Sequence, residues 1–331
     1  MSGPEGSSNK HCIVCAVGIS APSILRLEHL ERRAWPGAFS IRTEDFYGVI
    51  GMRTGLVLEG GAMRGMYTAG VLDSFLDHGV QVDGILGVSA GACFGCNLFS
   101  GQRGRALRYN QRFMSDPRNV SLRSLIITGD IVNREFAYYT IPTKYDVFDE
   151  AAFEAHGGEY WVVVTNVETG EAEYMQMHHL LEDIEMMRAS ASMPFCSRMV
   201  EIGGKKYLDG GVADSIPVRH ALEMGFDRLI VVLTQPASYR KAPMNKALIR
   251  AFYRKYPNLC STLLHRHERY NAQAEEVRQL EEEGKIFVIR PKEPLNIRRL
   301  EKNPAELARV HGIGLRDAEE SMTALKAYLE A

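Results

Sequence analysis

The chain alternates short apolar runs with longer segments in which apolar residues recur at helical spacing. Residues 55–59, 85–88, 160–164 and 229–233 are short, mostly apolar runs. Such runs are typical of strands that are buried on both faces of a parallel sheet. Residues 66–78 carry apolar side chains at helical spacing and end before a glycine, which predicts a helix. The middle of the chain therefore predicts an α/β fold.

Further helices are expected between and after these strands. Residues 90–99 are rich in small residues and apolar on every side, which is typical of a helix packed in the centre of a sheet structure. The other predicted elements are helices at 180–191, 217–224, 245–256, 261–283 and 304–329 and a strand at 285–290. We expect a poorly ordered N-terminal extension (1–53), an α/β domain (54–235) and a mainly helical C-terminal region (236–331).

Composition and charge exclude several classes of protein. The 331 residues suffice for one large domain with an appendage. A hydrophobic content of 45% and a charged content of 24% exclude a disordered, collagen-like or disulfide-scaffold chain. With a formal charge of −2, the chain lacks the excess of basic residues that is typical of a nucleic-acid-binding protein, so we expect no nucleic-acid partner. No window of about 18 uninterrupted apolar residues occurs, so no membrane-spanning helix is expected.

The six cysteines follow no regular spacing, which favours reduced thiols and a cytoplasmic location. Two C-x-x-C pairs, Cys12/Cys15 and Cys93/Cys96, are the only candidates for a zinc site in the sequence. They are far apart and lack the glycines and polar neighbours of a zinc ribbon, so we expect no metal and no cofactor. The apolar stretch 12–19 is a poor signal peptide, because a single lysine precedes it.

Three glycine-containing segments carry the candidate chemistry, and the first lies between a predicted strand and a predicted helix. It consists of Gly60, Gly61, Ala62, Met63, Arg64 and Gly65. Its glycines permit a tight turn, and the start of the following helix presents free N–H groups to an anion. The same residues approximate G-x-A-x-x-G, with Asp83 at the distance of a ribose-binding acid. A dinucleotide site is therefore an alternative at this point.

The second segment, Gly87-Val88-Ser89-Ala90-Gly91, is a G-x-S-x-G motif between a predicted strand and a predicted helix. This is the context of a nucleophile elbow, in which the turn lifts the serine hydroxyl off the sheet. The positive end of the helix that begins at Ala90 would favour an anion at the reacting carbon. A serine N-cap after a glycine turn is the alternative, and we interpret Ser89 as a nucleophile.

The third segment is Asp209-Gly210-Gly211. An aspartate on a glycine turn commonly forms an Asx-turn with its own backbone. A serine nucleophile needs a base, however, and a desolvated carboxylate can act as one.

In this order, the three segments resemble those of the patatin-like phospholipases. That family has G-G-G-x-[RK]-G, then G-x-S-x-G, then D-G-[GA], and residues 189–194 also resemble its A-S-x-x-x-P block. The resemblance covers residues 54–235 and implies a three-layer α/β/α core with a mainly parallel sheet. Ala62 departs from the third glycine of the pattern, and its methyl group is tolerable at a negative φ.

The resemblance implies a serine lipid acyl hydrolase with a Ser–Asp dyad. Ser89 would attack an ester carbonyl, and Asp209 would accept the proton directly. The backbone N–H groups of residues 60–65 would form the oxyanion hole. Arg64 would either hold this loop or face a phosphate head group. A Ser–Asp–His triad with His220 and a non-catalytic lipid-binding protein are the alternatives, although His220 falls in a predicted helix.

Residues 240–269 are strongly basic, with eight lysine or arginine residues and one acidic residue. Aromatic residues lie among them. This composition predicts either a solvated helical face or peripheral contact with an anionic membrane. We expect a lipid or simple carboxyl ester as the substrate, whose class and chain length no motif specifies.

Overall fold

The computed structural model describes residues 52–331. The predicted N-terminal extension (1–53), including Cys12, Cys15 and the apolar stretch 12–19, lies outside the described residues apart from its last two positions. Within residues 52–331, no helix has both the length and the apolar character needed to span a bilayer.

In the described part of the chain, eight strands form a single sheet. Their bounds are β1 (Thr54–Leu58), β2 (Gly84–Val88), β3 (Glu159–Asn166), β4 (Ala172–Met177), β5 (Val200–Ile202), β6 (Lys205–Asp209), β7 (Arg228–Val232) and β8 (Phe287–Ile289). The strand order is β5-β6-β3-β2-β1-β7-β8, and β4 pairs with β3. Strands β3, β2, β1, β7 and β8 run parallel, whereas β4, β5 and β6 add antiparallel pairings. The sheet is therefore mainly parallel, as predicted.

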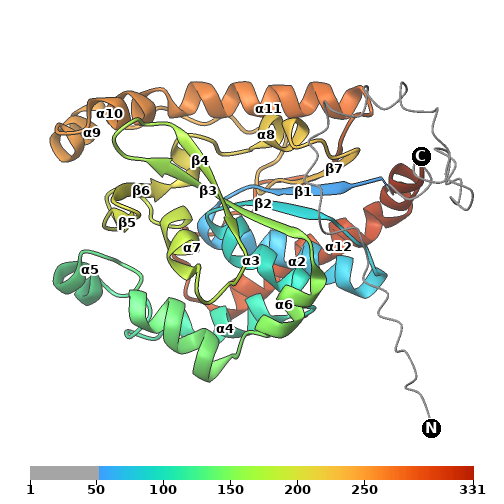
Figure 1. Cartoon of the computed structure of the whole chain (residues 1–331), viewed down its shortest axis with the longest axis horizontal. Coiled ribbons are helices and arrows are strands. Elements are labelled where there is room, and N and C mark those ends of the chain that lie inside the picture. Colours follow the sequence, from blue (N-terminus) through green and yellow to red (C-terminus); the bar gives the residue numbers. More distant parts are fainter. Residues whose placement is uncertain (1–51) are drawn as a thin grey trace, which may run out of the picture. The chain divides into compact units, whose positions relative to one another are not determined.

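Helices cover both faces of the sheet. The α-helices are α2 (Gly65–His78), α3 (Ala90–Phe99), α4 (Arg105–Phe113), α5 (Leu122–Thr128), α6 (Glu150–His156), α7 (Ile184–Ser190), α8 (Val218–Glu223), α9 (Lys246–Tyr253), α10 (Pro257–Leu264), α11 (Arg266–Glu282) and α12 (Pro304–Glu330). Figure 1 shows α8 and α11 on one face and α2, α3 and α12 on the other. The three-layer α/β/α prediction is thus confirmed.

The alternation of side chains along β1 explains these layers. Leu56 and Leu58 pack into the core cluster beneath α2, α3 and α12, whereas Val57 packs into the cluster beneath α8 and α11. Ile230 and Val231 on β7 divide between the two clusters in the same way. Because successive side chains of a strand point to opposite faces, a strand covered on both sides is apolar throughout.

The basic stretch differs in detail from the prediction. The helices expected at 245–256 and 261–283 are three helices, α9, α10 and α11. Pro257 begins α10 because proline fits the first turn of a helix but not its interior. His265 ends α10 and precedes α11 with non-helical backbone angles.

The sequence pattern also missed a π-helix, η4 (Glu135–Tyr145). Pro142 lies inside it, and its wide turns do not follow the spacing of an α-helix. Two 3-10 turns, η3 (Ala62–Arg64) and η5 (Gly210–Val212), fall within the glycine segments.

The C-terminal helix α12 packs directly on α2. A Cβ atom on Gly70 would overlap the carbonyl of His311, and one on Gly314 would overlap the carbonyl of Tyr67. The helices therefore approach backbone to backbone. A buried contact of 2.8 Å between His311 Nε2 and Asp73 Oδ2 links the same two helices.

Candidate active site

Ser89 occupies the sharp turn between β2 and α3. Its φ of 54° and ψ of −118° are strained for a residue with a side chain. Its N–H donates to Ser190 Oγ at 2.9 Å, and its carbonyl accepts from the N–H of Cys93 at 3.0 Å. Gly91 lies so close to the carbonyl of Leu58 that a Cβ atom would overlap it. These contacts hold the serine in a conformation that it would not favour alone.

Asp209 ends β6 and faces Ser89. Ser89 Oγ donates to Asp209 Oδ2 at 2.7 Å, and the N–H of Gly211 donates to Oδ1 at 2.8 Å. The serine is 7% exposed and the aspartate 6%. Because the hydroxyl contacts the carboxylate directly, a proton can pass between them without an intervening group.

Residues 189–194 hold both members of this pair. Ser190 accepts from the backbone of Ser89, and the carbonyl of Ser192 accepts from the N–H of Asp209 at 2.8 Å. Ser192 Oγ donates in turn to the carbonyl of Arg188 at 2.8 Å. The block that resembles A-S-x-x-x-P is therefore a brace between the two candidate catalytic residues.

The electrostatics of Asp209 suit a base. Burial raises the pKa of Asp209, whereas the Arg266 guanidinium, the hydrogen bond from Ser89 and the N–H of Gly211 lower it. Arg266, in the first turn of α11, donates from Nε to the carbonyl of Gly211. A buried carboxylate with a raised pKa is a stronger base than an exposed one, and it can accept a proton from a hydroxyl that contacts it.

The glycine-rich loop lies directly against Ser89. A Cβ atom on Gly60 would come within 2.9 Å of Ser89 Cβ and of the carbonyl of Val88, so only glycine fits there. Ala62 has a φ of 49°, and the negative φ that would make its methyl group tolerable is not observed. The departure from the glycine pattern therefore places an alanine in a conformation that favours glycine.

The N–H groups of this loop divide into two sets. Met63 donates to the carbonyl of Arg299, Arg64 to that of Gly61, and Gly65 to those of Ala62 and Met63. Among residues 52–331, no acceptor takes the N–H groups of residues 60, 61 and 62. The first half of the loop thus has donors for an anion beside Ser89.

Glu59 anchors the loop from below. Glu59 Oε2 accepts from the N–H of Thr234 at 2.6 Å and from its hydroxyl at 3.1 Å, and Oε1 accepts from the Tyr270 hydroxyl at 2.8 Å. Arg64 Nε donates to Thr234 Oγ1 at 3.4 Å. Strand β1, the end of β7 and helix α11 are thereby tied together next to the nucleophile.

Two residues of the alternative schemes lie away from this centre. His220 stacks on the Tyr174 ring with centroids 3.5 Å apart. Within residues 52–331, it makes no hydrogen bond to Ser89 or Asp209. Asp83 accepts a hydrogen bond from the N–H of Thr54, the first residue of β1. It therefore lies at the N-terminal end of this strand, whereas the glycine loop follows its C-terminal end. It is therefore not placed to bind a ribose at that loop.

Two cavities meet at Ser89. They share Ala62, Ser89, Met193 and Leu300. The first is mostly apolar, and side chains of α3, α4, α7 and η4 line it, including Phe94, Met114, Ala137, Tyr138, Ile141 and Met187. The second is polar, with Glu59, Arg64, Asp209, Lys241, Arg266, His267 and Arg299 in its wall. Ser89, the candidate nucleophile, therefore lines both an apolar and a charged cavity.

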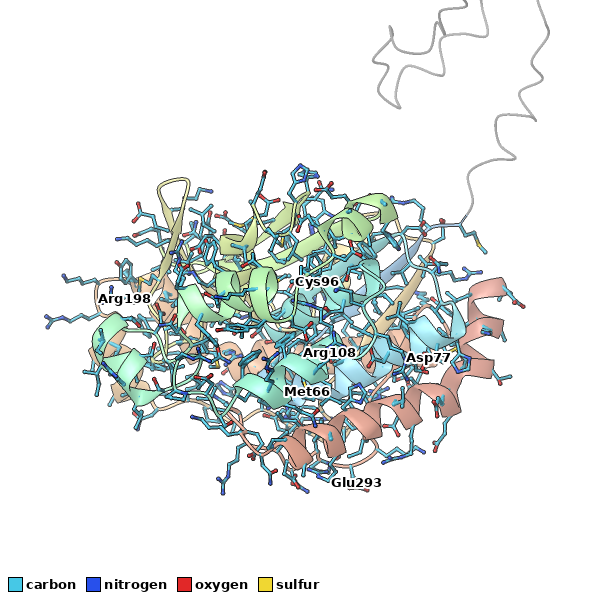
Figure 2. All side chains as sticks on the ribbon, turned by 90° about the horizontal axis from the view of Figure 1, so that it is seen from below. Met66, Asp77, Cys96, Arg108, Arg198 and Glu293 are labelled. Carbon is cyan, nitrogen blue, oxygen red and sulfur yellow. The ribbon has the colours of Figure 1, made fainter. Side chains whose placement is uncertain are left out.

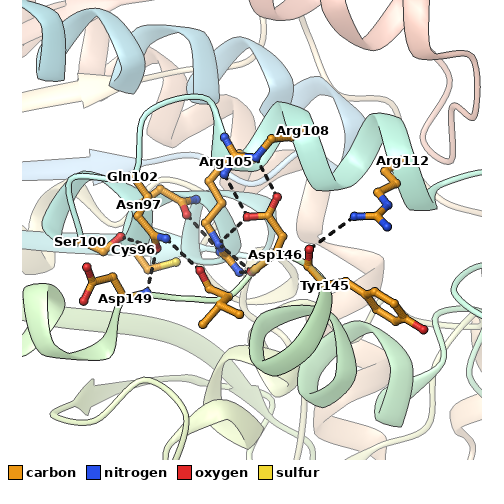
Figure 3. A network of polar contacts seen from close by, with 12 residues as sticks. Cys96, Asn97, Ser100, Gln102, Arg105, Arg108, Arg112, Tyr145, Asp146 and Asp149 are labelled. Carbon is orange, nitrogen blue, oxygen red and sulfur yellow. Dashed lines mark hydrogen bonds and ion pairs between the residues drawn. The ribbon is translucent and has the colours of Figure 1, made fainter.

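One cation in the wall of the apolar cavity is neutralised (Figure 3). Arg105 is buried, donates to Asn97 Oδ1 at 3.1 Å and to the Asp146 carbonyl at 2.8 Å, and pairs with the Asp146 carboxylate at 3.3 Å. Arg108 pairs with the same carboxylate at 2.8 Å. This network keeps the charge of Arg105 out of the cavity.

Cys93 and Cys96 lie on α3 and line the apolar cavity, and Cys96, which is labelled in Figure 2, is buried. Burial raises the pKa of both thiols, that of Cys96 to about 12. Cys96 donates to the carbonyl of Cys93. Both thiols are therefore protonated at neutral pH and behave as small apolar side chains.

No motif in the sequence assigns Lys241, Arg266, His267 or Arg299 to the site. The first three belong to the basic stretch, for which a surface role was considered. The sequence around α11 does not indicate which of its basic side chains point into the protein and which point to solvent. Only the contact of Arg266 with the D-G-G turn identifies it.

Comparison with protein families gives two matches. A model described as patatin-like phospholipase matches residues 56–222, just over half of the chain. A model described as a domain of unknown function (DUF6363) matches residues 256–330. The first match contains Ser89 and Asp209, and the second contains Arg266 and Arg299.

Several known proteins are similar to this chain. Uncharacterized protein YjjU of Escherichia coli is 31% identical over 199 residues, covering 58% of this chain and 54% of YjjU. Lysophospholipase NTE1 of Debaryomyces hansenii is 30% identical over 197 residues, covering 58% of this chain and 12% of NTE1. The chain thus spans about half the length of the first relative and far less of the second. VipD from Legionella pneumophila aligns over 82% of this chain and 67% of VipD, with 13% identity and a TM-score of 0.42.

Proposed function

Because the chain belongs to the patatin-like phospholipase family, we propose that it is a serine lipid acyl hydrolase that cleaves a carboxyl ester. The observation that carries this proposal is the 2.7 Å hydrogen bond from Ser89 Oγ to Asp209 Oδ2 at the junction of the two cavities. The lysophospholipase named among the relatives supports a lipid substrate.

Acylation begins when Ser89 Oγ attacks the ester carbonyl carbon and Asp209 Oδ2 takes the hydroxyl proton. The tetrahedral intermediate then breaks the bond to the alcohol oxygen, which receives that proton from Asp209. The products of this half-reaction are a free alcohol and an acyl ester on Ser89. Water next attacks the acyl carbon while Asp209 removes its proton, and the fatty acid leaves as Ser89 regains its hydrogen.

The oxyanion of both intermediates would lie against the N–H groups of residues 60, 61 and 62. Loss of one such donor costs about 2.7–4 kcal/mol of barrier in a serine hydrolase. The N-terminus of α3 contributes a further positive potential at the same place. Because the N–H groups of residues 63–65 already donate to carbonyls, we narrow the proposed oxyanion hole from residues 60–65 to its first half.

The apolar cavity is suited to the acyl chain. Its walls consist mainly of aliphatic and aromatic side chains, and it opens onto Ser89. An acyl chain placed there leaves water at about 25 cal/mol for each Å² of apolar surface buried. The dimensions of this cavity would determine which length of acyl chain fits best.

The decisive experiment labels the protein with a fluorophosphonate probe and measures hydrolysis of a panel of lipid esters. We expect labelling and turnover in the wild type, no labelling in Ser89→Ala, and a loss of at least about 10³-fold in turnover in Asp209→Asn. His220→Ala serves as the matched control and should retain activity. Turnover that survives Asp209→Asn but is lost in His220→Ala would overturn the dyad in favour of the triad.

A non-catalytic lipid-binding protein is the remaining alternative. It predicts that the wild type binds lipids and turns over none of the panel. Probe labelling alone does not distinguish the two functions, so the hydrolysis measurement decides between them.

We also propose peripheral contact with an anionic membrane, as the basic stretch suggested. Exposed apolar side chains gather on α5 and α9: Leu122 (71% exposed), Ile126 (83%), Ile127 (64%), Leu248 (45%) and Phe252 (61%). Both helices lie at one end of the molecule in Figure 1, and Arg198 lies at that end in Figure 2. Such side chains are suited to enter the boundary between head groups and acyl chains.

Residues 193–196 connect this end of the molecule to the site. Phe195 packs edge-on against Phe252, and the carbonyl of Cys196 accepts from the N–H of Ile131 just after α5. The same residues line the polar cavity. Four exposed basic residues on or after α9 would face the membrane: Lys246, Arg250, Arg254 and Lys255.

Vesicle co-sedimentation tests this contact. An Ile126→Asp/Phe252→Asp double variant should lose most of its binding to vesicles that contain anionic lipid, because each basic residue contributes only about 1 kcal/mol. Leu222→Asp, at an exposed position on α8, is the control. Wild-type binding that does not depend on anionic lipid would overturn the proposal.

A further inference from the structure

The polar cavity concentrates positive charge beside the nucleophile. Arg64, Lys241, Arg266 and Arg299 all line it. The first three are partly buried, and Arg299 is exposed. Within residues 52–331, none of these four side chains has a carboxylate oxygen within 4.0 Å. The cavity therefore holds four cations that no ion pair neutralises.

The two acidic groups in the same wall are already occupied. Both oxygens of Glu59 accept hydrogen bonds from Thr234 and Tyr270. Both oxygens of Asp209 accept from Ser89 and Gly211. Neither carboxylate lies within 4.0 Å of a cation in the described residues, although Asp209 and Arg266 shift each other's pKa. The four cations of the lining outnumber its two carboxylates.

The cations destabilise one another in the absence of an anion. Burial, followed by the Arg266 and Arg64 charges, lowers the pKa of Lys241 to about 7, against the opposing effect of Glu59 and Asp209. Burial also lowers the pKa of Arg266. Lys241 Nζ lies 3.9 Å from the centroid of the Tyr270 ring, which offers only a weak partner. Uncompensated cations in a partly buried cavity are costly unless a ligand supplies the counter-charge.

A second group in the same wall lacks a partner. His267 lines the cavity, and its Nδ1 atom is buried with no hydrogen-bond partner in the described part of the chain. Burying a polar atom without a hydrogen-bond partner is destabilising, and a ligand or a water molecule in the cavity would supply the partner.

The two cavities together offer the apolar and cationic surroundings that the two ends of a phospholipid would need. They share Ser89, so an ester at the nucleophile has an apolar chamber on one side and a cationic chamber on the other. In a glycerophospholipid, one glycerol unit carries both the acyl ester and, on another of its carbons, the phosphate. Guanidinium groups bind phosphate oxygens through two parallel hydrogen bonds, and an ammonium group adds a point charge.

Building on the proposed acyl hydrolase activity, we propose that Lys241, Arg266 and Arg299, with Arg64, bind the phosphate of the substrate head group. The enzyme would then prefer esters that carry an anionic phosphate over neutral esters. Three of these four residues lie after residue 236. The C-terminal region thus supplies the head-group specificity.

The test compares two monomeric substrates with the same short acyl chain, 1-acylglycerol 3-phosphate and 1-acylglycerol. We expect the wild type to favour the phosphate ester at least tenfold in kcat/KM. Lys241→Gln and Arg299→Gln should each lower that ratio about tenfold. Lys326→Gln and Arg316→Gln, at exposed positions on α12, are the matched controls and should keep it. A wild-type ratio near one, or a ratio unchanged in both cavity variants, overturns the proposal.

A binding measurement separates this proposal from the hydrolase activity itself. Ser89→Ala protein should bind glycerol 3-phosphate in calorimetry, and Lys241→Gln in that background should weaken the binding about tenfold. Binding without turnover of any ester would refute the hydrolase and retain the phosphate site. Inorganic phosphate that binds as tightly as glycerol 3-phosphate, with no preference between the two esters, would identify a free-phosphate site and overturn the head-group assignment.

Discussion

The two cavities at Ser89 differ in whether the cations in their walls are paired with a carboxylate. In the wall of the apolar cavity, Arg105 donates a hydrogen bond to Asn97 and forms an ion pair with Asp146, which neutralises its charge. In the polar cavity, Lys241 and Arg266 have no carboxylate partner within 4.0 Å in the described chain. A buried arginine is thus structural where it is paired. Where it is unpaired and faces a cavity, it indicates a ligand.

The cavities also differ in origin along the chain. Apart from Leu300, the apolar cavity is built from residues 62–193, whereas the polar cavity draws much of its wall from residues 239–300. The reaction centre lies where these two parts meet. The patatin-like match therefore covers Ser89, Asp209 and the lining of the apolar cavity apart from Leu300, and the second family match covers part of the lining of the polar cavity.

The largest expected effect comes from filling each cavity in turn with a bulky side chain, which tests whether the two cavities bind different parts of the substrate. Ala137→Phe narrows the apolar cavity and should reduce kcat/KM for long-chain esters by about 10–100-fold, because overpacking a chamber costs about 1–3 kcal/mol. Short-chain esters should be affected much less. The measurement is a chain-length series at fixed head group.

Ala242→Phe is the matched change in the polar cavity. It should reduce the preference for phosphate-bearing esters and leave the chain-length profile in place. A chain-length profile that moves equally in both variants would show that the two cavities do not act separately.

The charge of Arg266 should be visible in the pH dependence of kcat/KM. Burial raises the pKa of Asp209, and Arg266 opposes that rise. The acidic limb of the profile should therefore lie above the ordinary range of an aspartate, since activity falls once the base is protonated. Arg266→Gln should move the limb to higher pH and cost about tenfold or more at its acidic end. A limb that stays in place would contradict this coupling.

Lys241 should make the substrate preference itself depend on pH. Its pKa of about 7 means that it loses its charge as the pH rises through neutrality. The charges that shift its pKa are those of Arg266, Glu59, Arg64 and Asp209, the Tyr270 ring contacts its ammonium group, and a bound phosphate would raise its pKa again. Preference for a phosphodiester head group, which does not titrate in this range, should fall several-fold between pH 6 and 8.5, an effect of about 1 kcal/mol. Lys241→Gln should show a flat preference over the same range.

The smallest expected effect concerns the loop that both cavities share. Ala62 has a φ of 49°, where an alanine is strained by about 1 kcal/mol. Ala62→Gly removes the strain but adds freedom to the unfolded chain, so the free energy of unfolding should rise by less than about 1 kcal/mol. Denaturant titration measures this change, and a clear loss of stability would show that the methyl group makes a compensating contact.

The sequence predicted those parts of the fold that have a strong hydrophobic period. Strands β1, β2, β3 and β7 were expected near their observed positions because they are apolar on both faces. The π-helix at 135–145 was missed because Pro142 and its wide turns hide the helical spacing. Strands β4 and β5 were missed because their outer faces are only partly buried.

Motif spacing selected Ser89 and Asp209, and the structure brings these two residues into contact. It could not select Lys241 or Arg299, which belong to no motif and reach the site only through the fold. The basic stretch was recognised, but charge alone does not tell whether a lysine faces water or a cavity. That distinction depends on long-range packing, which local sequence patterns do not record.

The close contact of α2 with α12 bears on how this chain can vary in evolution. Gly70 and Gly314 leave no room for a side chain, so the two helices must change together. Helix α2 begins at Gly65, the last residue of the loop beside the nucleophile, and α12 follows shortly after Arg299. A substitution at the crossing would shift both ends of the site at once. We therefore expect the glycine loop and the C-terminal region to vary together, so that a graft of one of them onto a distant relative would need the other.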